Sequence, residues 1–253
     1  DHDDWQDLTK YEKMMAKATE YDVDIVFCMS EEYVTHKNRC YVIDKLRKPF
    51  RDEKPYRLDT WEKKLTVLRG FYPPWAKIVR TDLVRRHNVE FSEGGNKSDD
   101  VLFHYHSILV AENVCYVNEV LYTHRFFPQS ISGQYREKGH KMVQDRFHTW
   151  QDLEKICKDL SLPRKKLFVL ILRDITKYAY KTDTPKTYID EAVRKLNELD
   201  MTKKDFPTGT KKFYLMAVKY SYLRQKFTLE CMQLKKQIKL LKGRPLHLNQ
   251  NEK

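Results

Sequence analysis

The short apolar segments of this 253-residue chain that are typical of buried β-strands all lie in its first half. Their ranges are 23–28, 77–79, 114–117 and 120–124. Residues 7–20 and 99–111 instead carry apolar side chains at helical spacing, so strand-like and helix-like segments alternate. The sequence therefore predicts an α/β layer in residues 1–133.

Beyond Tyr135 the apolar spacing is helical only. The predicted helices cover residues 136–160, 164–181, 186–199 and 211–242, and prolines precede the last three of them. We therefore expect an all-α appendage over residues 134–253. Residues 31–74 are polar and contain four prolines, which favours a long connection with at most a short helix near residues 60–69.

Composition indicates a globular protein, because 41% of the residues are hydrophobic and 13% are aromatic. Five widely spaced cysteines without a Cys-x-x-Cys pattern argue against a disulfide framework and against structural zinc, so a reducing, cytoplasmic compartment fits best. Cys28 and Cys115 are expected to be buried fillers. The longest apolar run, Leu167–Leu172, is much shorter than a membrane-spanning helix requires, and the first residues do not form a signal peptide.

The formal charge of +12 is concentrated near the C-terminus, where residues 201–253 hold 13 basic and 3 acidic side chains. Such a basic helical segment could rest on anionic lipid headgroups at the inner face of a membrane. Alternatively, its apolar face packs on the catalytic domain and its lysines are only solvated. The charge and the 16 tyrosines would also suit a non-catalytic, RNA-binding protein, although no nucleic-acid motif supports that function.

Two groups of carboxylates are the candidate catalytic residues. Asp1, Asp3 and Asp4 open the chain, and Asp99 and Asp100 lie at the start of a predicted helix. Clustered carboxylates repel one another unless a hard cation such as Mg²⁺ or Mn²⁺ lies between them, where it can also hold substrate phosphates. Each group could instead cap a helix N-terminus, which favours acidic residues.

A series of motifs surrounds these carboxylates in a fixed order. They are Asp1-His2-Asp3-Asp4-Trp5, Asp24-Ile25-Val26-Phe27, Trp75-Ala76-Lys77-Ile78-Val79-Arg80, Phe91-Ser92-Glu93-Gly94, Asp99-Asp100-Val101-Leu102-Phe103, Leu121-Tyr122-Thr123-His124-Arg125 and Ser130-Ile131-Ser132. The series resembles the second half of a bacterial family 2 glycosyltransferase of the GT-A fold, over residues 1–132. The resemblance implies a partial GT-A sheet, and it implies that about a hundred residues of the nucleotide-binding half would precede Asp1. As written, the chain is expected to be inactive.

The resemblance also implies the roles of individual residues. Asp3 and Asp1 would hold Mn²⁺ or Mg²⁺, and Asp100 would be the catalytic base. His124 and Arg125 would approach the donor diphosphate, although a strand-end arginine paired with a surface acid is an equal alternative. Trp75 and Asp99 would lie near the acceptor, whereas tryptophan is more often core filling. Lys77 could pair with an acid beneath the site.

The function that follows from the resemblance is inverting sugar transfer, in one displacement, from a nucleotide-sugar donor to a saccharide or lipid-linked acceptor. A carboxylate within reach of the acceptor hydroxyl would take its proton, and the cation would stabilise the departing diphosphate. The implied product is a bacterial surface polysaccharide or lipopolysaccharide, assembled at the cytoplasmic side of the membrane. No nucleic-acid partner is expected.

Overall fold

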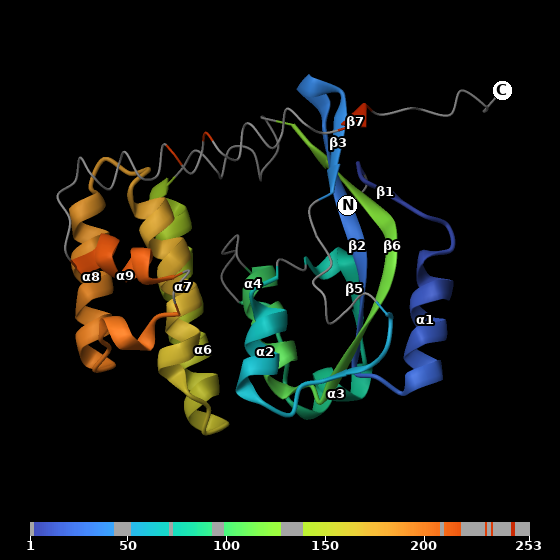
Figure 1. Ribbon diagram of the computed structural model, residues 1–253, viewed down its shortest axis with the longest axis horizontal. Coiled ribbons are helices and arrows are strands. Elements are labelled where there is room, and N and C mark those ends of the chain that lie inside the picture. The colour runs from blue at the N-terminus through green and yellow to red at the C-terminus, as the bar shows by residue number, and fades with distance from the viewer. Residues whose placement is uncertain are drawn as a thin grey trace. The chain divides into compact units, whose positions relative to one another are not determined.

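The computed structural model describes residues 3–42, 52–70, 73–92, 99–127, 139–207, 210–218, 231, 234 and 244–245. The chain divides into two compact units (Figure 1). The first contains residues 1–91, 103–130 and 239–253, and the second contains residues 92–102 and 131–238. The fold is α/β, as the sequence predicts.

A mixed sheet forms the centre of the first unit. Its strands are β1 (Trp5–Gln6), β2 (Ile25–Val34), β3 (Arg39–Val42), β4 (Tyr56–Arg57), β5 (Lys77–Val79), β6 (Asn113–Phe126) and β7 (Arg244–Pro245). The order across the sheet is β1-β6-β2-β3-β7, while β4 pairs with β6 and β5 pairs with β2. The two long strands, β2 and β6, are parallel, and the other pairs are antiparallel.

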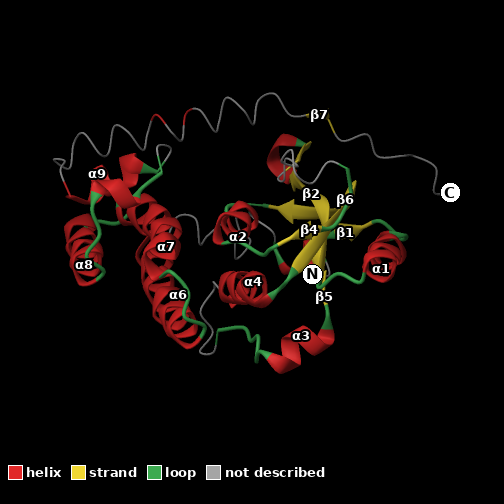
Figure 2. Ribbon diagram, turned by 60° about the horizontal axis from the view of Figure 1, so that its bottom comes forward, coloured by secondary structure: helices red, strands yellow, loops and turns green. Residues whose placement is uncertain are grey.

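Helices cover both faces of the β2–β6 pair. The helices near the sheet are α1 (Lys10–Tyr21), α2 (Trp61–Leu68), α3 (Thr81–Arg86) and α4 (Asp99–Val110). Val26 of β2 packs with Met14 of α1, whereas its neighbour Phe27 points to the other face and contacts His104 of α4. Figure 2 shows α1 and α2 on opposite sides of the strands. Burial on both faces explains why these segments read as continuous apolar runs.

The prediction of a long irregular connection over residues 31–74 is partly wrong. β2 does not end near Cys28 but continues to Val34, and β3 and β4 also fall within residues 31–74. Strand pairing extends across polar residues because they have partners on β6: Thr123 Oγ1 donates to Glu31 Oε1 at 3.2 Å, and Glu32 aligns with His124. The short helix predicted near residues 60–69 is confirmed as α2.

Two strands predicted at residues 114–117 and 120–124 form one strand, β6. The register against β2 shifts between Cys28 and Ser30, so the polar pair that follows Val117 is accommodated as a bulge rather than a strand end. Thr81 is the first helical residue of α3, and the N-cap position of this helix is Arg80.

The second unit is helical, with α6 (Gly139–Asp159), α7 (Arg164–Ala179), α8 (Pro185–Glu198) and α9 (Lys211–Val218). Trp150 of α6 packs on Phe168 of α7, with ring centroids 4.7 Å apart and both side chains fully buried. A Cβ at Gly139, where α6 begins, would lie 3.0 Å from the Lys181 carbonyl carbon, so a larger residue there needs a shift of a few tenths of an ångström in this neighbour. Short 3₁₀ helices complete the described elements: Thr35–Lys37, Pro74–Ala76 and Lys203–Asp205.

The helices predicted beyond Tyr135 are confirmed up to Val218. Most of the predicted basic helix over residues 211–242 lies outside the described residues. The expectation of helices alone fails at β7, which pairs with β3. Within the described residues, no helix has both the length and the apolar character needed to span a bilayer.

Candidate functional site

Three strands bring distant parts of the sequence together at the carboxyl end of the β2–β6 pair. Trp5 of β1 pairs with Thr123 of β6, and Glu32 of β2 aligns with His124. Open α/β sheets bind ligands at this end of their parallel strands. We call the following residues the carboxyl-end cluster: Asp3, Asp4, Lys10, Glu32, Trp75, Tyr122, His124 and Arg125.

Asp4 connects the first residues to β6. Tyr122 Oη donates to Asp4 Oδ2 at 2.6 Å, and the Arg125 backbone N–H donates to Asp4 Oδ1 at 2.7 Å. Burial, and then the hydrogen bond to Asp4, raise the pKa of Tyr122, so the phenol keeps its proton and remains a donor. Asp4 therefore fixes the approach of β1 to β6, a role that the sequence did not indicate.

Trp75 stacks against two side chains on one face of β6. Its ring centroid lies 4.4 Å from that of Tyr122 and 5.5 Å from that of His124, with the planes nearly parallel. Tyr122 and His124 share this face because they are two residues apart on a strand. Trp75 is half-buried, so it is part of the core packing and also partly open to solvent.

Lys10 of α1 holds the backbone beneath this stack. It is 1% exposed, its Nζ donates to the Trp75 carbonyl at 2.6 Å, and Nζ lies 4.7 Å from the centroid of the Tyr122 ring. Burial lowers the pKa of Lys10. The hydrogen bond and the aromatic contact offset the cost of burying this ammonium group, and together they hold the Trp75 backbone beside Tyr122.

His124 and Arg125, the predicted diphosphate contacts, lie beside this stack. His124 Nδ1 is 3.8 Å from Glu32 Oε2, and both side chains are mostly buried. The Arg125 side chain is exposed, and its guanidinium carbon lies 5.8 Å from the centroid of the Phe127 ring. Within the described part of the chain, no carboxylate pairs with Arg125, so its guanidinium can meet an anionic ligand.

Asp3 is the described member of the predicted metal pair, while Asp1 lies outside the described residues. The Asp3 carboxylate makes no hydrogen bond or ion pair to another described side chain, and its charge contributes to the raised pKa of Tyr122. Among described residues, no set of three or more His, Cys, Asp or Glu side chains is arranged around a metal position. Mg²⁺ in phosphate sites uses only one or two carboxylates together with the phosphates, so an available Asp3 fits that role.

Asp99 and Asp100 begin α4, as predicted. The Asp99 side chain lies outside the description, and Asp100 is half-buried. Both residues belong to the second unit, so their convergence with Asp3 stays a prediction.

His104, further along α4, contacts a lysine of β5. The buried Nζ of Lys77 lies 3.2 Å from His104 Nδ1. Burial, followed by the charge of Lys77, holds the pKa of His104 well below its ordinary value, so the imidazole is neutral and accepts from Lys77.

Sequence reasoning missed Lys10, Glu32 and Tyr122. Tyr122 could have been found from its two-residue spacing to His124, which places both on one strand face. Lys10 gives no such signal, because a lysine in an amphipathic helix is usually solvated. Glu32 was missed because β2 was predicted to end before it.

Neither a protein-family model nor a curated protein matches this chain. Structural comparison finds TarS from S. aureus. Its residues 1–349 in complex with UDP-GlcNAc match at 15% identity and a TM-score of 0.45, over 92% of this chain and 66% of that one. The same fragment in complex with UDP matches at 16% identity and a TM-score of 0.41, over 92% of this chain and 65% of that one. A longer TarS structure matches at 15% identity and a TM-score of 0.42, over 90% of this chain and 38% of that one. This chain thus spans less than two thirds of those structures, and likeness at this level does not by itself assign a fold family or an activity.

Proposed function

We propose that this chain contains the acceptor and metal side of an inverting glycosyltransferase that uses a nucleotide-sugar donor. The observation that supports the proposal is the convergence of Asp3, Trp75 and Arg125 at the carboxyl ends of parallel strands. These residues come from segments about 50 to 120 positions apart, and each matches a position of the family motifs in the sequence. A carboxylate can hold a metal ion, an aromatic ring can support a sugar face, and a guanidinium can bind phosphate oxygens.

The donor side of the proposed site consists of Asp3, Asp1, His124 and Arg125. Asp3, with Asp1, would hold Mg²⁺ or Mn²⁺, which supplies Lewis-acid stabilisation of the diphosphate leaving group. Arg125 offers two parallel N–H donors to phosphate oxygens. His124 stacks on Trp75 and lies beside Glu32, and it would lie next to the same phosphates.

The acceptor side consists of Trp75, Asp99 and Asp100. In the proposed step, the acceptor oxygen forms a bond to the anomeric carbon while the bond from that carbon to the diphosphate oxygen breaks. Asp100 takes the hydroxyl proton, and the electron pair leaves with the diphosphate. One displacement inverts the anomeric centre. Trp75, held by Lys10, would support one face of the acceptor sugar.

The wider setting is proposed on the resemblance alone. The acceptor would be a saccharide or a lipid-linked saccharide, and the product a bacterial surface polysaccharide or lipopolysaccharide. The enzyme would work at the cytoplasmic side, with its basic C-terminal segment near anionic lipid.

A calorimetric titration tests the donor site. A version of the chain extended upstream by a nucleotide-binding half is titrated with UDP-, GDP- and dTDP-sugars, with Mn²⁺ and then with EDTA. We expect at least one donor to bind only with Mn²⁺, and Asp3→Asn to weaken that binding about tenfold or more, because one of only one or two protein ligands is lost.

Asp59→Asn is the matched control, since Asp59 is an exposed acid of the same unit whose partner is Lys63. It should leave donor affinity unchanged. A donor affinity that changes neither when Mn²⁺ is removed nor in the Asp3→Asn variant would contradict the proposed metal site.

A further inference from the structure

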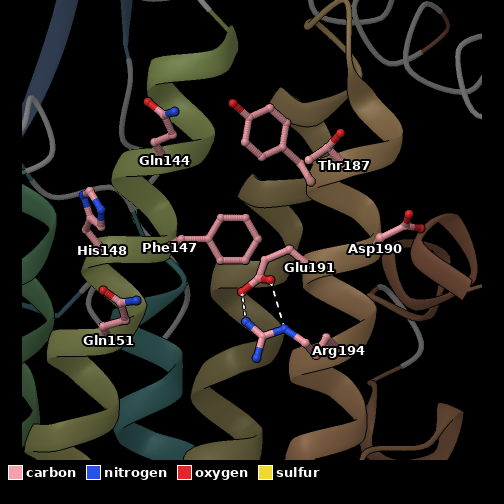
Figure 3. A pocket seen from close by; sticks show the side chains of 9 residues that line it. Gln144, Phe147, His148, Gln151, Thr187, Asp190, Glu191 and Arg194 are labelled. Carbon is pink, nitrogen blue, oxygen red and sulfur yellow. Dashed lines mark hydrogen bonds and ion pairs between the residues drawn. The ribbon is translucent and has the colours of Figure 1, made fainter.

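A pocket of about 470 Å³ lies between α6 and α8 in the second unit. Figure 3 shows Gln144, Phe147 and Gln151 along α6, facing Thr187 and Glu191 of α8. The volume is sufficient for a small polar ligand. Nothing in the proposed transfer reaction uses these residues.

The carboxylates and the guanidinium of this pocket already have ionic partners. Arg194 Nε donates to Glu191 Oε2 at 3.0 Å, and a second nitrogen of Arg194 contacts the other Glu191 oxygen (Figure 3). Asp190 is paired with Lys186 at the next turn. Because these ions are already paired, the pocket is poorly suited to a phosphate or a cation and better suited to a neutral ligand.

Neutral hydrogen-bonding groups remain available around the pocket. Within the described residues, the side chains of Gln144, Gln151 and Thr187 make no hydrogen bonds. Each amide offers two donors and an acceptor, and a threonine hydroxyl offers both functions. Together they can satisfy the mixed donors and acceptors of vicinal hydroxyl groups.

Two aromatic rings complete the pocket wall, Phe147 and Tyr188. Both are half-buried. The Tyr188 hydroxyl lies 3.0 Å from His140 Nδ1, and the other imidazole nitrogen of His140 contacts Asp183. This chain of contacts ties the ring to the start of α6 and to the segment before α8. These contacts favour one orientation of Tyr188 before a ligand arrives.

We propose that this pocket is a binding subsite for a neutral saccharide segment. The C–H face of a pyranose ring packs on Phe147 and Tyr188, and its hydroxyls bind Gln144, Gln151 and Thr187. The identification of this segment with the growing acceptor glycan rests on the proposed function. The pocket then gives the helical unit a role in retaining a polymer between successive transfers.

Saturation-transfer NMR of the whole chain tests the subsite. The probes are neutral trisaccharides of glucose, galactose, N-acetylglucosamine and xylose, with glucose and glucose 6-phosphate as a matched neutral and anionic pair. EDTA is present and no nucleotide sugar is added, so the result is independent of the donor site. We expect at least one neutral trisaccharide to bind, and glucose 6-phosphate to bind no better than glucose.

Variants separate the pocket from the rest of the surface. Phe147→Ala should weaken trisaccharide binding about tenfold through loss of the stacking face, and Gln144→Ala by several-fold. Gln144 is exposed, so its variant folds normally even if Phe147→Ala does not. Leu160→Ala, an exposed apolar residue just after α6, should have no effect. The proposal is overturned if the whole neutral panel fails to bind or if Gln144→Ala leaves binding unchanged. Preference for the sugar phosphate would also overturn it.

Discussion

At the residue scale, polar side chains that the sequence presents as isolated are paired with one another. Lys10 supports Trp75, Tyr122 fixes Asp4, and Lys77 meets His104. All of these contacts join residues far apart in the sequence, so none follows from local spacing. The predicted roles of Trp75, His124 and Arg125 came from the family resemblance, whereas the residues that support them became visible only in the structure.

The buried His104 predicts how stability depends on pH. Its pKa is lowered well below the ordinary value of 6.5 by burial and by Lys77, and the pKa of His106 is lowered by burial and by His87. Below pH 6.5 the unfolded chain binds protons that the folded chain does not. The free energy of unfolding should therefore fall as pH decreases, by up to about 1.4 kcal/mol per pH unit for the buried His104 and by less for the half-buried His106.

Urea unfolding between pH 7 and pH 5 measures this effect. His104→Asn keeps an acceptor for Lys77 but cannot titrate, so its unfolding free energy should decline less steeply over that range. The comparison concerns slopes, and a lower starting stability of the variant does not affect it. Equal slopes for the two proteins would show that His104 is not held neutral by its surroundings.

Asp100 is the residue on which the proposed chemistry depends. In a version of the chain extended upstream by a nucleotide-binding half, Asp100→Asn should lower the transfer rate by roughly 10²- to 10⁴-fold, because a base that accepts the acceptor proton is lost. Donor affinity, measured by calorimetry, should survive. A near-normal transfer rate in this variant would remove Asp100 from the mechanism.

At the element scale, a lysine from one helix satisfies the end of another. Lys64 Nζ of α2 donates to the carbonyls of Ile108, Leu109 and Ala111, at the C-terminal end of α4. Burial lowers the pKa of Lys64 to about 8. The last carbonyls of a helix have no partners within it, and a cation there also interacts favourably with the helix dipole.

Replacing Lys64 tests this capping. Lys64→Met keeps a long side chain and should lower the free energy of unfolding by roughly 1–3 kcal/mol, because buried carbonyls lose their donor. Lys63→Met is the control, since the Lys63 side chain makes an exposed pair with Asp59 and a 6.0 Å contact with the Tyr56 ring, and its loss should change stability by less than about 0.5 kcal/mol. Thermal denaturation of both variants gives the comparison. Similar losses would mean that α4 does not depend on Lys64.

The type of most elements could be predicted from the sequence, but the extent of the central strands could not. Apolar periodicity located α1, α4 and the helices of the second unit. It failed after Cys28, because Glu31 and Glu32 are stabilised in β2 by partners on β6 that no local window contains. The polar pair at the β6 bulge was likewise read as a strand end, since a bulge leaves no signal in apolar spacing.

At the scale of the whole molecule, the chain combines an α/β unit that carries the carboxyl-end cluster with a helical unit that carries the α6–α8 pocket. Sequence reasoning predicted the order of these regions, because strand-like and helix-like patterns separate along the chain. It could not predict the pocket, whose residues lie on helix faces that look like ordinary solvated surface. The two sites permit separate tests, one with nucleotide and metal and one with saccharide.

The central claim is that Asp3 lies at a metal and diphosphate site at the carboxyl ends of β2 and β6. Crystals of the chain grown with Mn²⁺ and UDP, and measured for the anomalous scattering of manganese, test it most directly. The account predicts one manganese peak in contact with the Asp3 carboxylate and with the diphosphate, and Arg125 on the same phosphates. UDP bound at another location, or a manganese peak without Asp3 among its ligands, would contradict it.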